Sequence, residues 1–385
     1  MNLLDQYAES LQQLKSQGNL RRFTSNIQQD KYITIEQQRM LNLSSNDYLG
    51  LASNIQLREE FFDVTDHSAR VMSAASSRLL TGNFPQYEQL EDTLSKAFLG
   101  RSALLFNSGY HMNIGILPAL SDSKTLILAD KLVHASMIDG IRLSAAKYLR
   151  YRHNDLNHLE QLLEKYQQDE AFNKIIVATE SIFSMDGDET DLAELVRIKN
   201  KYQNVMLYVD EAHAIGVRGK QGLGCAEQYH VINDIDLLVG TFGKAIASIG
   251  GYLICHPIIR EYLINSMRPL IFSTAQPPMC MGWTNFVLNK VFLLNDSREK
   301  LHDLSQYLQR SIMAKQYECP STSHIVPVVI GESQKTVNLA KHIQNEGFYV
   351  MPVRPPTVPK QSARLRISLT ALIEQPEIDA LIALL

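Results

Sequence analysis

The strongest fold signal in this chain is the stretch Leu237-Leu238-Val239-Gly240-Thr241-Phe242-Gly243-Lys244. Its apolar start, which follows Asp236, predicts a buried strand. The run then passes into small residues, which let a backbone approach a ligand closely, and it ends at a lysine. A lysine at the end of a buried strand lies in a dry pocket, where its pKa falls and its amine becomes nucleophilic. A solvated surface lysine is the simpler interpretation of this stretch alone, so the rest of the chain has to discriminate between the two.

The bulk composition excludes several classes of protein. A length of 385 residues is ample for a large core or for two domains, and 45% hydrophobic with 20% charged residues is typical of a soluble globular protein. The formal net charge of −4 argues against general attraction to nucleic acid or to an anionic membrane. No apolar run is long enough to span a bilayer, and the start of the chain lacks the features of a signal peptide. The four scattered cysteines form no C-x-x-C pair, so we expect a cytoplasmic protein with buried thiols and no metal site.

The order of the predicted elements indicates an α/β fold. Apolar residues at helical spacing predict an amphipathic helix over 2–17, and two short strands are expected over 32–35 and 40–43. Strands of the main sheet are then predicted over 103–106, 125–128, 147–151, 175–179, 206–209 and 237–239. Because helix-sized segments separate these strands, the sheet should be mainly parallel and covered on both faces.

The carboxyl-terminal part of the chain follows a different pattern. After about residue 257 the sequence predicts long helices, and three later strands are expected over 325–330, 348–351 and 364–369. This pattern indicates a smaller α+β domain. We therefore expect an N-terminal helix and arm over 1–46, a large domain over 47–285 and a small C-terminal domain over 286–385.

Polar residues follow several of the predicted strands, and ligands of open α/β sheets gather at the carboxyl ends of strands. Ser108-Gly109-Tyr110 lies between a strand and a helix, where backbone N–H groups and the helix dipole attract a phosphate. Asp210 and His213 follow the strand over 205–209, and a buried carboxylate there is costly unless it meets a cation such as a protonated heterocyclic nitrogen. An ordinary turn and a capping aspartate are the simpler interpretations.

Further polar residues take similar positions. His134 follows the strand at 126–128 by a short loop, and Glu180 and Ser184 follow the strand at 175–179. A packed structural histidine is the simpler interpretation of His134 alone.

Two motifs suggest other functions and are set aside. Asp210-Glu211-Ala212-His213 spells the DEAH box of helicase-type ATPases, but that box needs a phosphate loop of the form G-x-x-x-x-G-K-[ST], which the chain lacks. The acidic residues over 186–191 resemble a calcium loop but lack the spacing and closing glutamate of an EF-hand, so we interpret them as a solvated turn.

Taken together, the motifs resemble those of the α-oxoamine synthases, pyridoxal-5′-phosphate (PLP) enzymes of the fold type I aminotransferase class. The resemblance runs nearly from end to end of the chain. It covers residues 45–51, 108–110, 130–136, 153–155, 180–188, 210–213, 240–244 and 272–274. Each motif is short, but their order and spacing together are highly specific. The resemblance implies a large, mainly parallel sheet domain and a smaller α+β C-terminal domain.

The resemblance also implies roles for individual residues. Lys244 would hold PLP as a Schiff base and act as general base, Asp210 would keep the ring nitrogen protonated, and His134 would stack on the ring. These three would form the catalytic set. The implied cofactor-binding residues are Gly109, Tyr110, His134, Ser184, Asp210, His213, Thr241, Lys244, Ser273 and Thr274. Ser273 and Thr274 would reach in from the second subunit of a homodimer with shared active sites. The implied substrate-binding residues are Arg21, Asn46, Thr357 and Arg366, of which Arg366 would grip the amino-acid carboxylate.

One stretch resembles a particular branch of this family. Arg354-Pro355-Pro356-Thr357-Val358-Pro359, followed by Ala363-Arg364-Leu365-Arg366, resembles the branch that condenses L-alanine with a pimeloyl thioester in biotin biosynthesis. The thioester would be carried by coenzyme A or by an acyl carrier protein. The chain departs from the usual family pattern at 72–78, at Tyr87, where a histidine is usual, and at 245–251.

Two alternatives stay open. The first is a sister enzyme, such as a glycine C-acetyltransferase, that uses glycine and a different acyl-CoA. The second is a protein without activity, either a PLP-binding regulator or an inactive partner subunit. A regulator of that type carries an N-terminal DNA-binding domain, for which no helix-turn-helix pattern is found here, and inactive subunits usually lose the lysine that this chain retains as Lys244.

Overall fold

A computed structural model describes residues 3–16 and 19–385, which form two compact units. The larger unit comprises residues 54–184 and 189–299. The smaller unit comprises the described residues up to Ser53, the short loop 185–188, and residues 300–385. The division falls inside helix α12 (Asn295–Ala314). The domain boundaries expected from the sequence, 1–46, 47–285 and 286–385, stay predictions.

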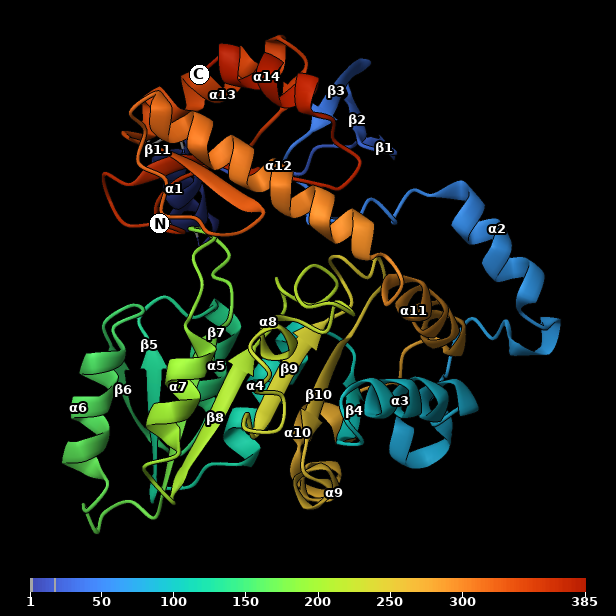
Figure 1. The fold of residues 1–385 in the computed structure, drawn as a ribbon, viewed down its shortest axis with the longest axis vertical. Helices are drawn as coiled ribbons and strands as arrows, with labels where there is room; N and C mark the ends of the chain where they lie inside the picture. The colour runs from blue at the N-terminus through green and yellow to red at the C-terminus, as the bar shows by residue number, and fades with distance from the viewer. Residues whose placement is uncertain (1–2, 17–18) are drawn as a thin grey trace. The chain divides into compact units, whose positions relative to one another are not determined.

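A seven-stranded sheet forms the centre of the larger unit (Figure 1), with the order β4-β10-β9-β8-β7-β5-β6. The strands are β4 (Ser102–Phe106), β5 (Thr125–Asp130), β6 (Lys147–Tyr151), β7 (Lys174–Glu180), β8 (Val205–Asp210), β9 (Leu237–Thr241) and β10 (Gly251–Cys255). Strand β10 pairs antiparallel with β4 and β9, and the other neighbouring pairs are parallel. The expectation of a mainly parallel sheet is therefore confirmed, and all six strands predicted for it are present.

Helices cover both faces of this sheet, as its apolar strands require. The helices of the larger unit include α2 (Ile55–Val64), α3 (Pro85–Ala97), α4 (Gly109–Ala119), α5 (Ala135–Leu143), α6 (Leu156–Tyr166), α7 (Leu192–Lys199), α8 (Cys225–Gln228), α9 (Pro257–Ser266), α10 (Arg268–Ile271) and α11 (Pro278–Val291), with short helical turns η1 (His67–Ala69) and η2 (Arg78–Gly82). On one face, α4, α5, α9 and α10 bury residues such as Ile116, Met137 and Leu263 against the strands. Helices α6 and α7 lie on the other face (Figure 1).

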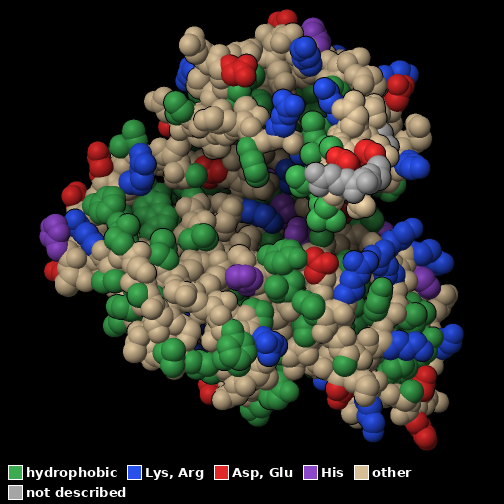
Figure 2. Space-filling model, turned by 180° about the vertical axis from the view of Figure 1, so that it is seen from behind, with side chains coloured by type: hydrophobic (Ala, Val, Ile, Leu, Met, Phe, Trp, Pro, Cys, Tyr) green, Lys and Arg blue, Asp and Glu red, His purple; other side chains and the backbone are tan. Residues whose placement is uncertain are grey.

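Strand β6 is an outer edge of the sheet, and its side chains discourage further pairing. Lys147 and Arg150 on this strand are exposed, as are Lys131, Arg142 and Arg152 nearby in the sequence. Figure 2 shows Lys and Arg side chains gathered at this edge. Charged side chains on an edge strand oppose the addition of another strand, so this basic cluster has a structural explanation.

The smaller unit contains two further sheets. A four-stranded sheet has the order β1-β2-β3-β12, and a three-stranded antiparallel sheet has the order β11-β14-β13. Their strands are β1 (Ile27–Gln29), β2 (Tyr32–Ile35), β3 (Gln38–Asn42), β11 (Ile325–Gly331), β12 (Phe348–Tyr349), β13 (Pro352–Val353) and β14 (Ala363–Ser368). The helices are α1 (Leu3–Ser16), the second part of α12, α13 (Ser333–Asn345) and α14 (Gln375–Ala383).

Several details differ from the sequence-based expectations. Helix α1 confirms the predicted N-terminal helix, although residues 2 and 17 lie outside the described residues. Strand β10 was not predicted, and the strand predicted over 348–351 is shorter, with β13 following it. Among the helices of residues 3–16 and 19–385, none has both the length and the apolar character that crossing a membrane requires.

Candidate active site

The candidate site in the larger unit begins with Lys244, which follows β9 in a tight turn. Its Nζ lies 2.8 Å from His213 Nε2. His213 is buried and Lys244 is half-buried. The lysine therefore does not extend into bulk water, which favours the reactive interpretation of the stretch over a solvated surface lysine.

Asp210, the last residue of β8, is a buried acceptor at the same edge of the sheet. Its Oδ1 accepts a hydrogen bond from the backbone N–H of Ala212 at 2.9 Å, and its Oδ2 accepts one from Asn113 Nδ2 at 3.1 Å. Both donors are neutral N–H groups. A buried carboxylate held in this way is a strong acceptor for a cationic N–H group of a ligand.

His134 precedes α5 and caps it. Its Nδ1 accepts from the Ser136 backbone N–H at 3.2 Å and lies 2.7 Å from Ser136 Oγ, while its own backbone N–H donates to Glu180 Oε1 at 2.6 Å. Loss of hydration lowers the pKa of His134, an effect that the nearby Asp210 opposes. The imidazole is therefore held neutral near pH 7, which suits a ring that packs against a flat ligand.

Two residues of this site were not singled out as site residues from the sequence. Asn113 on α4 donates from Nδ2 to Asp210 and, at 2.9 Å, to Ser136 Oγ. Glu180 ends β7 in register with Asp210 on β8, is almost fully buried, and holds the backbone of His134. A polar residue inside the apolar run of α4 was the available signal for Asn113, because a buried amide requires partners.

The start of α4 is the position at which the sequence predicts a phosphate site. Ser108 caps the helix, with its Oγ accepting from the His111 N–H at 3.1 Å, and the first N–H groups of a helix have no intrahelical acceptor. Gly109 lies beside Thr241, because a Cβ added to this glycine would come within 3.6 Å of the threonine Cβ. The structure thus brings together Gly109, Tyr110 and Thr241. The Tyr110 phenol donates to Asp139 Oδ2 at 2.7 Å, so its backbone is the group available at the helix start.

The remaining predicted cofactor residues are also part of the larger unit. Ser184 and Ser273 are half-buried and Thr274 is exposed. The Thr274 carbonyl accepts from Asn107 Nδ2 at 2.8 Å, which ties this segment to the turn that follows β4.

All four predicted substrate residues belong to the smaller unit. Arg366 on β14 donates from Nη1 to Ser368 Oγ at 2.6 Å and from Nη2 to Asn46 Oδ1 at 3.3 Å, so these bonds hold its planar fork in place. Arg21 donates from Nη2 to Thr357 Oγ1 at 3.1 Å. The structure therefore pairs Arg366 with Asn46 and Arg21 with Thr357.

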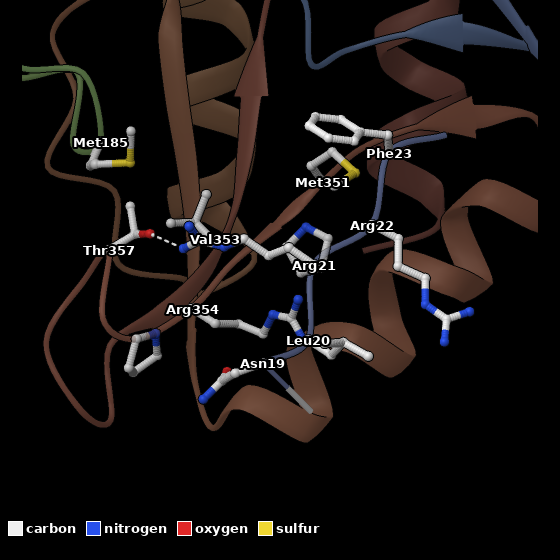
Figure 3. Close-up of a pocket in the computed structure, with 12 residues that line it drawn as sticks. Asn19, Leu20, Arg21, Arg22, Phe23, Met185, Met351, Val353, Arg354 and Thr357 are labelled. Atoms are coloured by element: carbon white, nitrogen blue, oxygen red, sulfur yellow. Dashed lines mark hydrogen bonds between the residues drawn. The ribbon is translucent and has the colours of Figure 1, made fainter. Parts of the chain in front are cut away.

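A cavity of about 680 Å³ lies beside Arg21 and Thr357 (Figure 3). Its lining combines three arginines, Arg21, Arg22 and Arg354, with apolar side chains. The apolar part includes Leu20, Phe23, Met185, Met351 and Val353. An apolar cavity with guanidinium groups in its lining suits a ligand with a long hydrocarbon part and a negative charge.

Comparison with known proteins identifies the family of the chain. Residues 38–385 match the family described as aminotransferase class I and II. A protein of Pasteurella multocida that is provisionally named 8-amino-7-oxononanoate synthase is 54% identical over 380 residues, which cover 98% of each chain.

Two solved structures are similar to this chain over most of its length. A serine palmitoyltransferase from S. paucimobilis with a bound PLP–myriocin aldimine has a TM-score of 0.89 and 25% identity, covering 100% of this chain and 97% of its own. An 8-amino-7-oxononanoate synthase from Francisella tularensis has a TM-score of 0.76 and 28% identity, covering 90% of this chain and 96% of its own. These matches confirm the expected fold type, and the chain belongs to the aminotransferase class I and II family.

Proposed function

We propose that this chain catalyses the 8-amino-7-oxononanoate synthase reaction of biotin biosynthesis, the decarboxylative condensation of L-alanine with a pimeloyl thioester, with PLP as cofactor. The names of relatives that match nearly the full chain support the reaction. The observation that carries the proposal is the contact of Lys244 with His213, at the sheet edge where Asp210 is buried. We further propose a cytoplasmic homodimer in which Ser273 and Thr274 reach into the site of the other subunit.

The residues of the larger unit fit PLP. Lys244 supplies a primary amine for the aldehyde, Asp210 supplies a buried acceptor for a protonated ring nitrogen, and the start of α4 supplies N–H groups for a phosphate. When bound, PLP supplies an electron-deficient ring that stabilises negative charge at the Cα atom of an amino acid.

The chain's own groups then have the following roles. Lys244 takes the proton from the alanine Cα as general base, and His213 orients the lysine amine. Arg366 binds the alanine carboxylate through its planar fork. His134 would cover one face of the cofactor ring. In the balanced reaction, Cα loses its proton and bonds to the acyl carbonyl carbon, and the carrier leaves as a thiolate that takes up a proton. The alanine carboxyl group is then lost as carbon dioxide, and a proton takes its place on Cα.

The cavity beside Arg21 and Thr357 supports a pimeloyl donor. A pimeloyl group combines a hydrocarbon chain with a terminal carboxylate, and the cavity combines apolar side chains with arginines. The carrier is coenzyme A or an acyl carrier protein, and an assay with both donors separates these two.

The test uses the purified full-length chain loaded with PLP. Reduction with borohydride and peptide mapping should find the cofactor on Lys244, and L-alanine with pimeloyl-CoA or pimeloyl-acyl carrier protein should yield 8-amino-7-oxononanoate. Lys244→Ala should abolish both results, whereas Lys220→Ala, at an exposed loop position, should keep them. Cofactor on another lysine would contradict the site assignment.

A sister enzyme that uses glycine and a different acyl-CoA is the second candidate, because the same lysine and buried carboxylate would serve it. Turnover with glycine and acetyl-CoA but not with L-alanine and a pimeloyl thioester would favour that candidate. An absence of any turnover in the PLP-loaded chain would favour a protein without activity.

A further inference from the structure

A buried polar network joins the two groups that we propose for the cofactor ring, and Asn113 is its centre. The Nδ2 atom of Asn113 donates to Asp210 Oδ2 at 3.1 Å and to Ser136 Oγ at 2.9 Å, while its Oδ1 accepts from Tyr208 Oη. Asn113 is 2% exposed and Tyr208 is fully buried. Water therefore competes little with these hydrogen bonds, and each bond is stronger than it is at a surface.

The Tyr208 phenol fixes which way the amide of Asn113 points. Burial raises the pKa of Tyr208 well above its ordinary value, so the phenol keeps its proton and donates it. The atom that faces the phenol must then be the amide oxygen, which leaves both N–H bonds of Nδ2 for Asp210 and Ser136. The reversed amide would place an acceptor oxygen against the Asp210 carboxylate, which is unfavourable.

The same network determines which nitrogen of His134 carries a proton. Nδ1 accepts from the Ser136 backbone N–H, so it is unprotonated. The Ser136 hydroxyl, 2.7 Å from Nδ1, must then donate to it, and this hydroxyl can do so because its oxygen accepts from Asn113. The proton of the neutral ring is consequently on Nε2.

We propose that Asn113 is a positioning residue of the cofactor site: it holds the Asp210 carboxylate and orients the Ser136 hydroxyl, which donates to His134 Nδ1 beside the Ser136 backbone N–H. The inference rests on the proposed function for the identity of the ligand that these groups meet. One amide thus sets the orientation of both Asp210 and His134, which come from strand β8 and from the start of α5.

The test compares the full-length wild type with Asn113→Ala, Tyr208→Phe and Tyr252→Phe. Tyr252 is the matched control, because it is fully buried on β10 and its hydroxyl has no hydrogen-bond partner within the described ranges 3–16 and 19–385. Nitrogen NMR of histidine-labelled protein without PLP reports the tautomer, with the His134 signals identified by their loss in His134→Phe. Titration with PLP, followed by fluorescence, reports the dissociation constant.

We expect Asn113→Ala to raise the dissociation constant for PLP about tenfold or more, because bonds to a charged partner are lost. The nitrogen signals of His134 should shift, because the Ser136 hydroxyl loses the donor that orients it, while the Ser136 backbone N–H keeps the ring as the Nε2–H tautomer. Tyr208→Phe should act in the same direction by less, and Tyr252→Phe should change the constant by no more than about twofold. A folded Asn113→Ala protein with unchanged His134 nitrogen signals and an unchanged dissociation constant would overturn the proposal.

The remaining outcomes also separate the explanations. If Asn113→Ala does not unfold cooperatively, the variant is not properly folded, and the dissociation constants of Tyr208→Phe and Tyr252→Phe are compared instead. Equal changes in these two constants would reflect lost packing and would overturn the proposal. If the wild type does not bind PLP, the proposed function fails. The His134 nitrogen signals in Tyr208→Phe and Asn113→Ala still test Asn113 in that case, because they report on the hydroxyl of Ser136 that Asn113 orients.

Discussion

Two carboxyl groups, those of Glu180 and Asp210, end neighbouring parallel strands at paired register positions. Like charges this close raise the energy of each other's ionised form. Asp210 accepts two N–H bonds through its carboxylate, whereas the Glu180 carboxyl accepts one from the His134 backbone. Burial, and then the charge of Asp210, raises the pKa of Glu180 well above its usual range. We therefore expect Glu180 in the folded protein to keep its proton at pH values above its usual pKa.

The first prediction follows from this raised pKa. Between the pKa of the unfolded chain and that of the folded chain, the folded protein keeps a proton that the unfolded chain releases. The free energy of unfolding of the wild type should then fall as pH rises, by about 1.4 kcal/mol per pH unit from this group. The Glu180→Gln side chain does not titrate, so it removes this pH dependence, and its amide oxygen can still accept from the His134 backbone N–H. The stability of this variant relative to the wild type should increase as pH rises above about 5 in urea unfolding at several pH values.

Glu194→Gln is the control for this measurement. Glu194 is half-buried on α7, and a hydrogen bond from Arg197 lowers its pKa. Its contribution to stability therefore has the opposite sign: it is present above the unfolded pKa and is lost as pH falls. The difference between this variant and the wild type should be constant above about pH 6. Parallel curves for wild type and Glu180→Gln would show that Glu180 is ionised in the folded protein.

The second prediction concerns Asp210. Asp210→Asn preserves size but removes the negative charge proposed to hold a ring nitrogen protonated. We expect PLP to bind more weakly, by about 1.5–3 kcal/mol, and turnover with L-alanine to fall by about a hundredfold or more. Spectroscopic titration and steady-state kinetics measure the two effects, with Asp303→Asn on the exposed side of α12 as control. Near-normal turnover would mean that another group holds that proton.

Among the secondary-structure elements, the parallel strands of the large sheet could be predicted from the sequence, whereas the antiparallel strand β10 could not. A parallel strand buried on both faces is continuously apolar, as over Leu237–Val239, and such a run can be recognised in the sequence. Strand β10 was missed because only residues 242–250 separate it from β9. That connection is too short for a crossover helix, so the strand returns antiparallel, outside the alternating pattern that guided the prediction.

The loop 185–188 shows a second limit of sequence interpretation. The acidic run that begins at Asp186 was interpreted as a solvated turn, and this interpretation was wrong for its first residues. Asp186 forms an ion pair with Arg364, and the Gly187 carbonyl accepts from the Thr322 N–H at 3.2 Å. Both partners are more than a hundred residues away in the sequence, so local composition could not reveal them.

The third prediction tests how tightly this loop is held. Gly187 has a φ of +71°, and a Cβ there would lie 1.9 Å from the Ile325 carbonyl oxygen. Gly187→Ala therefore combines backbone strain with a steric clash and should destabilise the protein by about 2–4 kcal/mol. Gly347→Ala is the control, because its φ of +91° imposes similar strain but a Cβ there would meet nothing within 4 Å. Urea unfolding should give about 1–2 kcal/mol for this control, and equal losses would contradict the packing argument.

Across the full chain, sequence spacing could locate the groups at one sheet edge but not those that long-range pairing brings together. Asp210, His213 and Lys244 follow parallel strands, and the carboxyl ends of such strands share an edge, so their proximity was predictable. The contact of Arg21 with Thr357 joins positions 336 residues apart, and no local pattern encodes it. Only the resemblance to a known family grouped Arg21 and Thr357, as expected substrate-binding residues.

The last prediction concerns two arginines of the smaller unit, Arg366 and Arg21, which we expect to bind different substrates. Arg366 alternates on β14 with Leu365 and Ile367, which are fully buried, and its fork is held by Ser368 and Asn46. A rigid guanidinium binds a carboxylate in two places, which a lysine cannot copy. Arg366→Lys should therefore raise the Michaelis constant for L-alanine whatever the acyl donor, whereas Arg310→Lys at an exposed position should have no effect.

Arg21 should act on the other substrate, because it lines the cavity that combines arginines with apolar side chains. Arg21→Ala should raise the Michaelis constant for the pimeloyl thioester and leave that for L-alanine almost unchanged. The loss of one charge-assisted contact corresponds to about 1.5–3 kcal/mol, or roughly a tenfold to hundredfold change. Steady-state kinetics with each substrate varied in turn distinguish the two variants. If Arg21→Ala changed only the constant for L-alanine, the cavity would not be the acyl site, because a residue in its lining would then act on the amino acid alone.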